Sequence, residues 1–165
     1  MTADKRAAAG FACAAAVLAL GTAYVAQYGF GLMPCELCLW QRVPYWAVIA
    51  VSLAALLLPR LCTPLVGLAV LLLAAAALLG AYHAGVEWSL WPNFLARCTP
   101  PPGPAARTVD DLIQALSKAP IVRCDEPAIR VLGLSMAGWN ALYGAAACVM
   151  TAMLLAAPAR ARRIA

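Results

Sequence analysis

Residues 61–86 read LCTPLVGLAVLLLAAAALLGAYHAGV and contain no Asp, Glu, Lys or Arg. An α-helix needs about 20 apolar residues to cross the hydrocarbon core of a bilayer, and this stretch is long enough. Residues 7–35, 43–59 and 131–159 also lack these four residue types, and the run from 43 is the shortest. Backbone amides in lipid must bond within a helix or a closed barrel. The Ala, Leu and Val runs lack the alternation of barrel strands, so four helices are predicted.

The composition of the whole chain supports the same class. Of 165 residues, 65% are hydrophobic and 12% are charged, whereas soluble domains carry about 25% charged residues. We therefore predict an all-α integral membrane protein, a four-transmembrane-helix bundle that forms one membrane domain over residues 1–165. Its helices are expected at 7–28, 43–59, 64–84 and 133–157, with outer loops at 29–42 and 85–132. No nucleic-acid motif is present, so membrane lipid is an expected partner and nucleic acid is not.

The first apolar run has a second interpretation, as a cleavable signal peptide, because Lys5 and Arg6 precede it. The apolar part of a signal peptide covers about 7 to 15 residues and ends at a small-residue cleavage site. This run continues through Tyr28 without such a site before the aromatic residues. It is therefore expected to remain as the first membrane helix.

The charges give the chain a predicted orientation. Four helices place both termini and the short connection near residue 60 on one side of the membrane. That side carries one acidic residue, Asp4, and six basic ones, namely Lys5, Arg6, Arg60, Arg160, Arg162 and Arg163. The other side has equal numbers of basic and acidic residues. Because Lys and Arg in short loops favour the cytoplasm, the termini are predicted to be cytoplasmic and the two outer loops to face outward.

All ten Trp and Tyr residues fall towards the outer ends of the expected helices. They are Tyr24, Tyr28, Trp40, Tyr45, Trp46, Tyr82, Trp88, Trp91, Trp139 and Tyr143. Anchoring at the membrane boundary accounts for such a distribution. An aromatic-lined site for a flat ligand near the outer surface accounts for it as well. Position alone leaves both explanations open.

Seven cysteines are present, and their positions divide them into two groups. Four fall in the outer segments as two pairs, Cys35 with Cys38 and Cys98 with Cys124. The other three, Cys13, Cys62 and Cys148, lie within apolar helices or face the reducing cytoplasm. These three are expected to serve only as small apolar residues.

A Cys-x-x-Cys spacing at the mouth of the second helix, as in Cys35 and Cys38, is typical of redox chemistry. A thiolate at Cys38 would gain from the positive N-terminus of that helix and from Arg42, four positions on. Pro44 leaves open whether the helix begins before or after Arg42. An arginine at the membrane boundary either extends its side chain outward to water or meets an anion, and both roles remain compatible with Arg42.

Cys98 and Cys124 enclose a proline-rich connector, and their pair has three possible roles. The pair can be an exchangeable disulfide, or a staple that only stabilises the loop. It can also join the other pair in a four-cysteine zinc site. Zinc usually takes two closely spaced ligand pairs, and this pair is far too wide, so no metal is expected.

Two motifs make the sequence resemble the disulfide bond formation protein B (DsbB) family over nearly its whole length. One is PCELCLWQR, residues 34–42, and the other is CDEP, residues 124–127, which leads into LGLSMAGWN, residues 132–140. The resemblance implies a protein of the bacterial inner membrane with its catalytic cysteines in the periplasm. It also implies a DsbA-like thioredoxin-fold partner and a quinone cofactor, ubiquinone or menaquinone.

The resemblance further implies a role for each site residue. Cys98 would carry the mixed disulfide with the partner, and Cys124 would then attack Cys35. Cys38 would be left as the thiolate beside the quinone, and Arg42 would stabilise negative charge on the quinone oxygen.

The role of His83, the single histidine, stays open from its position alone. It either relays a quinone proton or is an interfacial side chain satisfied by water. For the whole protein, the alternative is a disulfide-stapled membrane scaffold without redox turnover.

Overall fold

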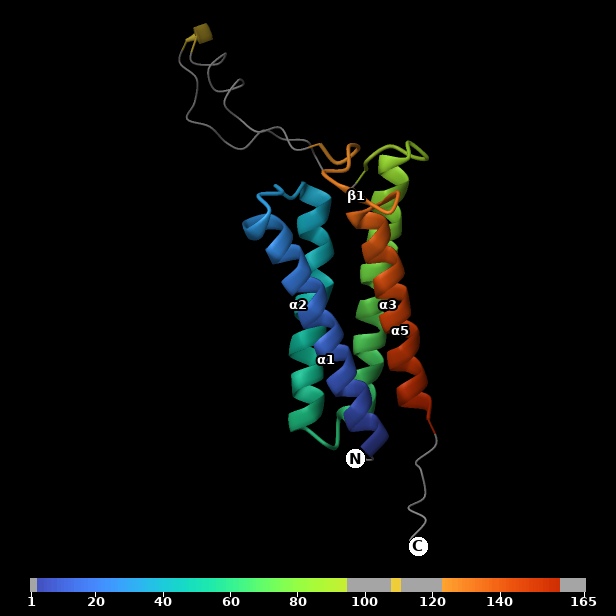
Figure 1. Cartoon of the computed structure of the whole chain (residues 1–165). Coiled ribbons are helices and arrows are strands. Elements are labelled where there is room, and N and C mark those ends of the chain that lie inside the picture. The colour runs from blue at the N-terminus through green and yellow to red at the C-terminus, as the bar shows by residue number, and fades with distance from the viewer. Residues whose placement is uncertain (1–2, 95–107, 111–122, 158–165) are drawn as a thin grey trace, which may run out of the picture.

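Four long helices run side by side in the computed structural model of the chain, which describes residues 3–94, 108–110 and 123–157 (Figure 1). They are α1 (Ala3–Tyr24), which continues as the π-helix η1 (Val25–Gly29), α2 (Glu36–Leu57), α3 (Cys62–Glu87) and α5 (Met136–Ala156). All four are long and apolar enough to cross a membrane. The predicted fold class, an all-α bundle of four transmembrane helices, is confirmed. The first residues of α1 and the last of α5 lie at the same end of this bundle (Figure 1).

Helix α2 begins at Glu36, earlier than the expected residue 43, because Cys35 acts as its N-cap. The backbone of Cys35 is extended, and its Sγ accepts a hydrogen bond from the Cys38 backbone N–H at 3.4 Å. Pro44 lies inside the helix rather than in its first turn. Proline donates no hydrogen bond to the preceding turn, but the helix continues through it. Residues 36–45 therefore form the first turns of one helix that contributes several side chains to the site.

Helices α3 and α5 approach closely because glycines face backbone atoms across their contact. A Cβ on Gly80 would lie 2.8 Å from Ala141 N, and one on Gly144 would lie 3.1 Å from Ala77 N. Small residues at such positions let membrane helices pack backbone against backbone. This contact fixes α5 against α3 below the end of the bundle opposite the termini, which holds residues 30–36 and 87–94 and is called the outer end (Figure 1).

The interior of the bundle is built from small side chains, and its outside is apolar. The central cluster consists mainly of alanines from α1, α3 and α5 together with Leu73, Val48 and Tyr45. Many large apolar side chains, such as Leu71 and Leu78, point away from the bundle and are exposed. An exposed apolar belt of this kind is what a hydrocarbon environment requires. The chain is accordingly a multi-pass membrane protein.

A small β-hairpin, which the sequence analysis did not predict, leads into α5. Its strands β1 (Arg130–Val131) and β2 (Leu134–Ser135) pair antiparallel. The two residues between them, Leu132 and Gly133, have φ values of 53° and 82°, as a two-residue hairpin turn requires. Ser135 then caps α5 by accepting a hydrogen bond from Gly138 N at 3.1 Å. The hairpin and residues 123–129 lie at the outer end of the bundle (Figure 1).

Candidate functional site

The cysteine pair of α2 lies at the outer end of the bundle. Cys35 Sγ and Cys38 Sγ are 3.2 Å apart, and both are free thiols. A disulfide has an S–S distance of about 2.05 Å, so a movement of about 1 Å would bring the sulfurs to bonding distance. The Cys35 thiol donates its hydrogen bond to Cys38 Sγ. This bond and the burial of Cys35 raise the pKa of Cys35 to about 12. Cys35 is therefore the protonated member of the reduced pair.

Cys124 lies against the same pair. It is only 4% exposed and packs in one buried cluster with Cys35, Leu37 and Val86. Burial raises the pKa of the Cys124 thiol, an effect opposed by a backbone hydrogen bond from Leu37. Its neighbour Asp125 is exposed and paired with Arg123, which lowers the pKa of that carboxyl group. The cluster joins a cysteine of the second outer loop to the cysteine at the start of α2.

His83 of α3 forms the third side of this cluster. It is 3% exposed, and its Nε2 lies 3.6 Å from Cys35 Sγ and 3.2 Å from the backbone oxygen of Cys124. Glu87, one helical turn further along α3, places Oε1 3.8 Å from the same nitrogen. A single ring nitrogen therefore faces a thiol, a carbonyl oxygen and a carboxylate.

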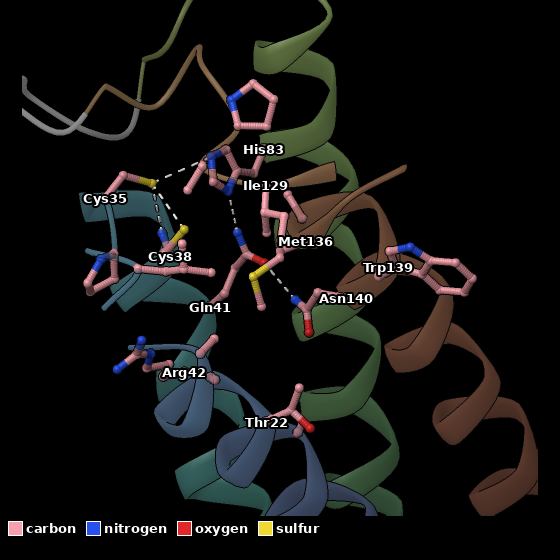
Figure 2. Close-up of a pocket in the computed structure, with 18 of the residues that line it drawn as sticks. Thr22, Cys35, Cys38, Gln41, Arg42, His83, Ile129, Met136, Trp139 and Asn140 are labelled. Atoms are coloured by element: carbon pink, nitrogen blue, oxygen red, sulfur yellow. Dashed lines mark hydrogen bonds between the residues drawn. The ribbon is translucent and has the colours of Figure 1, made fainter. Parts of the chain in front are cut away.

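The other ring nitrogen ends a chain of hydrogen bonds that crosses three helices. Tyr45 Oη donates to Asn140 Oδ1 at 2.8 Å, and Asn140 Nδ2 donates to Gln41 Oε1 at 2.6 Å. Gln41 Nε2 in turn donates to His83 Nδ1 at 2.7 Å. Because Nδ1 accepts, the proton of the neutral ring lies on Nε2 and faces Cys35 (Figure 2). The direction of the chain thus selects one tautomer of His83.

A cavity of about 450 Å³ opens beside the cysteines and extends between the helices. Both sulfurs of the α2 pair and His83 border it, and most of its wall is apolar. The apolar side chains include Leu18, Ala26, Met33, Ile129 and Met136. Pockets of this size and character are typical of small-molecule sites.

Arg42 lies on the wall of this cavity and turns towards α1. Its Nη1 donates to Gln27 Oε1 at 2.7 Å, and its guanidinium carbon lies 4.8 Å from the ring centroid of Tyr24. Figure 2 shows the side chain pointing away from the cysteine pair. Its Nε is buried and has no hydrogen-bond partner in the part of the chain that the structure describes. One donor of Arg42 is therefore buried and unpaired among the described residues.

The model of the family described as disulfide bond formation protein DsbB matches residues 5–155. The chain belongs to the DsbB family. It is therefore a disulfide bond formation protein of the membrane, with the activity of a disulfide oxidoreductase. The DsbB family is in general associated with a quinone and with a thioredoxin-fold DsbA partner.

One curated relative is similar over most of its length. It is the uncharacterized protein RP370 of Rickettsia prowazekii (strain Madrid E), which is 30% identical over 142 residues, or 86% of this chain and 83% of that protein. No solved structure matches the chain.

Of the candidate site residues named from the sequence, the structure brings four to one end of the bundle: Cys35, Cys38, Cys124 and His83. Arg42 is on the cavity wall but contacts Gln27 and Tyr24, where the sequence suggested Cys38 as its neighbour. Cys98 lies outside the described residues. The remaining cysteines are remote from the pair: Cys62 Sγ donates to Lys5 O, Cys148 Sγ donates to Val70 O, and Cys13 is half-buried in α1.

Sequence reasoning missed the polar chain that supports His83. Gln41 and Asn140 stand inside the two motifs that carry the DsbB resemblance, but no role was predicted for either residue. The presence of Gln41 and Asn140 in apolar spans was itself a signal, because uncharged polar side chains are uncommon there and need hydrogen-bond partners. The partners themselves depend on how three helices are rotated about their axes, which the sequence does not specify.

Proposed function

We propose that the chain reoxidises a DsbA-like periplasmic dithiol oxidase and passes the electrons to a membrane quinone, using the pairs Cys98–Cys124 and Cys35–Cys38. The observation that carries this proposal is the burial of Cys124 in one cluster with Cys35, whose sulfur is 3.2 Å from Cys38 and borders a cavity. A relay between two cysteine pairs requires Cys124 to lie close to Cys35. A disulfide that only stabilises the loop does not require this contact.

The outer exchange begins with the thiolate of the reduced partner. It attacks Cys98 of the Cys98–Cys124 disulfide, forms a mixed disulfide with Cys98 and releases Cys124 as a thiolate. Cys124 attacks Cys35, which opens the Cys35–Cys38 bond and leaves Cys38 as a thiolate. The partner's second thiol then attacks the partner's first sulfur, which is bonded to Cys98 in the mixed disulfide. The partner is thereby oxidised, and Cys98 is released. Cys98 finally attacks Cys124, so the outer disulfide reforms and Cys35 is released.

The surroundings of Cys35 support its place in this sequence. Cys35 leaves Cys124 as a thiolate, and the Nε2–H of His83, 3.6 Å away, can stabilise that negative charge by a hydrogen bond. The high pKa of Cys35 means that this thiolate then takes up a proton from solvent. Cys38, which accepts the hydrogen bond, is then the sulfur that carries negative charge.

The cavity and Arg42 fit a quinone head group. The cavity holds about 450 Å³ and is largely apolar, and the Arg42 side chain on its wall places one guanidinium group beside it. A quinone bound there would supply the oxidising power, taking two electrons and two protons from the inner dithiol. Arg42 would hold its oxygen by a charge-assisted hydrogen bond, and Cys38 would supply the electron pair as the Cys35–Cys38 disulfide reforms.

The orientation that we propose places both termini in the cytoplasm and all four catalytic cysteines at the periplasmic face of a bacterial inner membrane. It is supported by the excess of basic residues at the end of the bundle that holds the start of α1. A membrane-impermeant maleimide should label Arg60→Cys in a variant lacking the seven native cysteines only in inverted vesicles. Labelling in right-side-out vesicles would show that the chain has the opposite orientation.

The proposal is tested by mixing the purified protein in detergent with a reduced DsbA-like protein and a soluble quinone analogue. Quinone reduction is followed by absorbance, with ubiquinone and menaquinone analogues in parallel. Wild type should turn over, Cys98→Ala should fail to oxidise the partner, and Cys38→Ala should fail to reduce quinone. Cys62→Ala is the matched control, because Cys62 lies at the opposite end of α3, and it should retain wild-type turnover.

Two outcomes would contradict the proposal. Absence of turnover with both quinone types would favour the stapled scaffold, whose cysteines stay oxidised and inert. A loss of activity in Cys62→Ala equal to that in Cys38→Ala would mean that the active pair is wrongly assigned.

A further inference from the structure

We propose that the reduced site binds one thiophilic divalent cation, with Zn²⁺ as its natural representative, through Cys35 Sγ, Cys38 Sγ, His83 Nε2 and a carboxylate oxygen of Glu87. The four groups come from the first turn of α2 and the last turns of α3. This ligand set differs from the four-cysteine zinc site considered from the sequence. It needs no cysteine from the second outer loop.

Three of the distances between these atoms are close to those of a small tetrahedron. With Zn–S bonds of about 2.3 Å and Zn–N or Zn–O bonds of about 2.0–2.2 Å, tetrahedral ligand atoms lie about 3.3 to 3.8 Å apart. The two sulfurs are 3.2 Å apart, Cys35 Sγ is 3.6 Å from His83 Nε2, and that nitrogen is 3.8 Å from Glu87 Oε1. The sulfurs and the ring nitrogen all lie within 4.8 Å of one another. Glu87 lies outside this group of three, so its carboxylate must approach the sulfurs to complete the coordination.

Glu87 provides an independent sign that a cation belongs here. Its side chain is 4% exposed, and Oε2 has no hydrogen-bond partner within the part of the chain that the structure describes. Its only ion pair there is the contact with His83. A buried carboxylate is costly without a positive partner, and a divalent cation between the thiolates and Glu87 supplies one. The two thiols, His83 and Glu87 also border the cavity, which gives an ion a route of entry.

The hydrogen-bond chain behind His83 can support metal binding. A histidine that binds metal through Nε2 usually donates its Nδ1–H to a neighbouring oxygen. Gln41 lies 2.7 Å from Nδ1. If the amide groups of Gln41 and Asn140 each rotate by 180°, Gln41 Oε1 accepts from Nδ1 and Nε2 is free for the metal. The same side chain thus supports both tautomers of His83.

Binding changes protonation and leaves every oxidation state unaltered. The two thiols lose their protons to solvent, the proton on the ring moves from Nε2 to Nδ1, and the cation enters as the dication. Soft thiolate ligands favour Zn²⁺ over Mg²⁺ and Ca²⁺. The Cys35–Cys38 disulfide offers no thiolate, so only the reduced protein binds. It follows, resting on the proposed function, that Zn²⁺ holds the inner pair reduced and inhibits turnover.

The direct test uses Co²⁺ as a spectroscopic substitute for Zn²⁺ on the reduced, quinone-free protein in detergent. One equivalent of Co²⁺ should produce thiolate-to-cobalt charge-transfer absorption and the visible bands of tetrahedral cobalt, and Zn²⁺ should bleach both. Wild-type protein with Cys35 and Cys38 oxidised is the control, since its sequence and fold are unchanged. Equal absorption in the oxidised control, or none in the reduced protein, would overturn the proposal.

Variants test the ligand set. Cys38→Ser and His83→Ala should abolish the charge-transfer bands or weaken Co²⁺ binding more than a hundredfold. Glu87→Gln should weaken Co²⁺ binding by about tenfold or more, because a neutral amide replaces the negatively charged fourth ligand. Cys62→Ser and Cys124→Ser should bind as wild type does. Unchanged binding in both His83→Ala and Glu87→Gln would refute the site.

A separate measurement addresses inhibition. In the quinone assay, buffered free Zn²⁺ should lower turnover of wild type, and a chelator should restore it. If no turnover occurs without Zn²⁺, the proposed function fails while the cobalt result stands. If turnover occurs and Co²⁺ does not bind, the metal site fails and the proposed function stands.

Discussion

The tautomer of His83 is the most direct prediction of the site geometry. Gln41 Nε2 donates to Nδ1 at 2.7 Å, and Nε2 faces Cys35 Sγ and the Cys124 carbonyl oxygen. We expect the metal-free reduced protein to hold the neutral ring with its proton on Nε2. Replacing Gln41 with Leu should weaken this preference, and Gln41→Glu should reverse it, because a carboxylate accepts from Nδ1–H.

The size of the effect follows from the bonds that the opposite tautomer loses. With the amides of Gln41 and Asn140 in the orientation that the structure shows, the opposite tautomer gives up the bond from Gln41 and the bond that Nε2–H donates to the Cys124 oxygen. At about 1 kcal/mol net for each bond, the preference is about 2 kcal/mol, or roughly thirtyfold. The Gln41→Leu variant loses one of the two bonds, so its preference should fall about fivefold.

Nitrogen NMR can measure this directly, because His83 is the single histidine of the chain. Selective ¹⁵N labelling of histidine gives the signals of one ring, and the shifts of its two nitrogens identify the tautomer. The Gln41→Glu variant keeps an oxygen that accepts the hydrogen bond from Asn140. Its free energy of unfolding should therefore change less than that of Gln41→Leu, but its turnover should fall. A wild-type ring protonated mainly on Nδ1, or the same ratio in Gln41→Leu, would refute the reasoning.

Three further predictions concern the cavity, the thiols and the helix contact. Arg42→Met should raise KM for quinone about ten- to a hundredfold, the value of a charge-assisted bond of about 1.5–3 kcal/mol, without a comparable change in KM for the partner; equal changes would remove Arg42 from the quinone site. In the reduced protein, iodoacetamide should modify Cys38 before Cys35, because the raised pKa keeps Cys35 a thiol, and Cys38→Ala should speed modification of Cys35. Peptide mass spectrometry measures both rates, and equal rates in wild type would contradict the assignment. Gly80→Ala should lower the free energy of unfolding in detergent by about 1–3 kcal/mol, whereas Gly67→Ala in the same helix, with open space at its Cβ, should not.

The fold could be predicted because membrane helices follow from a one-dimensional property, the length of uncharged apolar runs. Residues 61–86 required only counting, and α3 (Cys62–Glu87) nearly coincides with them. Helix starts depend on local capping, which is less regular. The expected start of α2 at residue 43 rested on the preference of proline for a first turn, but the Cys35 side chain caps the helix a full two turns earlier.

The site could be predicted only as far as sequence neighbours reveal it. Cys35 and Cys38 are three residues apart, so their contact follows from any helical turn. Cys124 is 86 positions and His83 is 45 positions from Cys38 in the sequence. Their contacts with the cysteine pair therefore depend on tertiary packing. Arg42 shows the converse, since its position one turn after Cys38 suggested a contact, but its long side chain found Gln27 and Tyr24 of the first helix instead.

The polar chain from Tyr45 to His83 explains how an apolar bundle can hold a redox site in register. Packing of alanines and leucines defines the distance between helices well but resists sliding only weakly, because one apolar contact resembles the next. The bonds among Tyr45, Asn140, Gln41 and His83 join α2, α5 and α3 at one level, and each is lost if a helix moves by one residue. Since His83 is fixed by this chain and Cys35 by its capping role, their separation does not depend on the loop that brings Cys124. The inner pair can therefore keep its environment while the outer cysteines exchange with a partner.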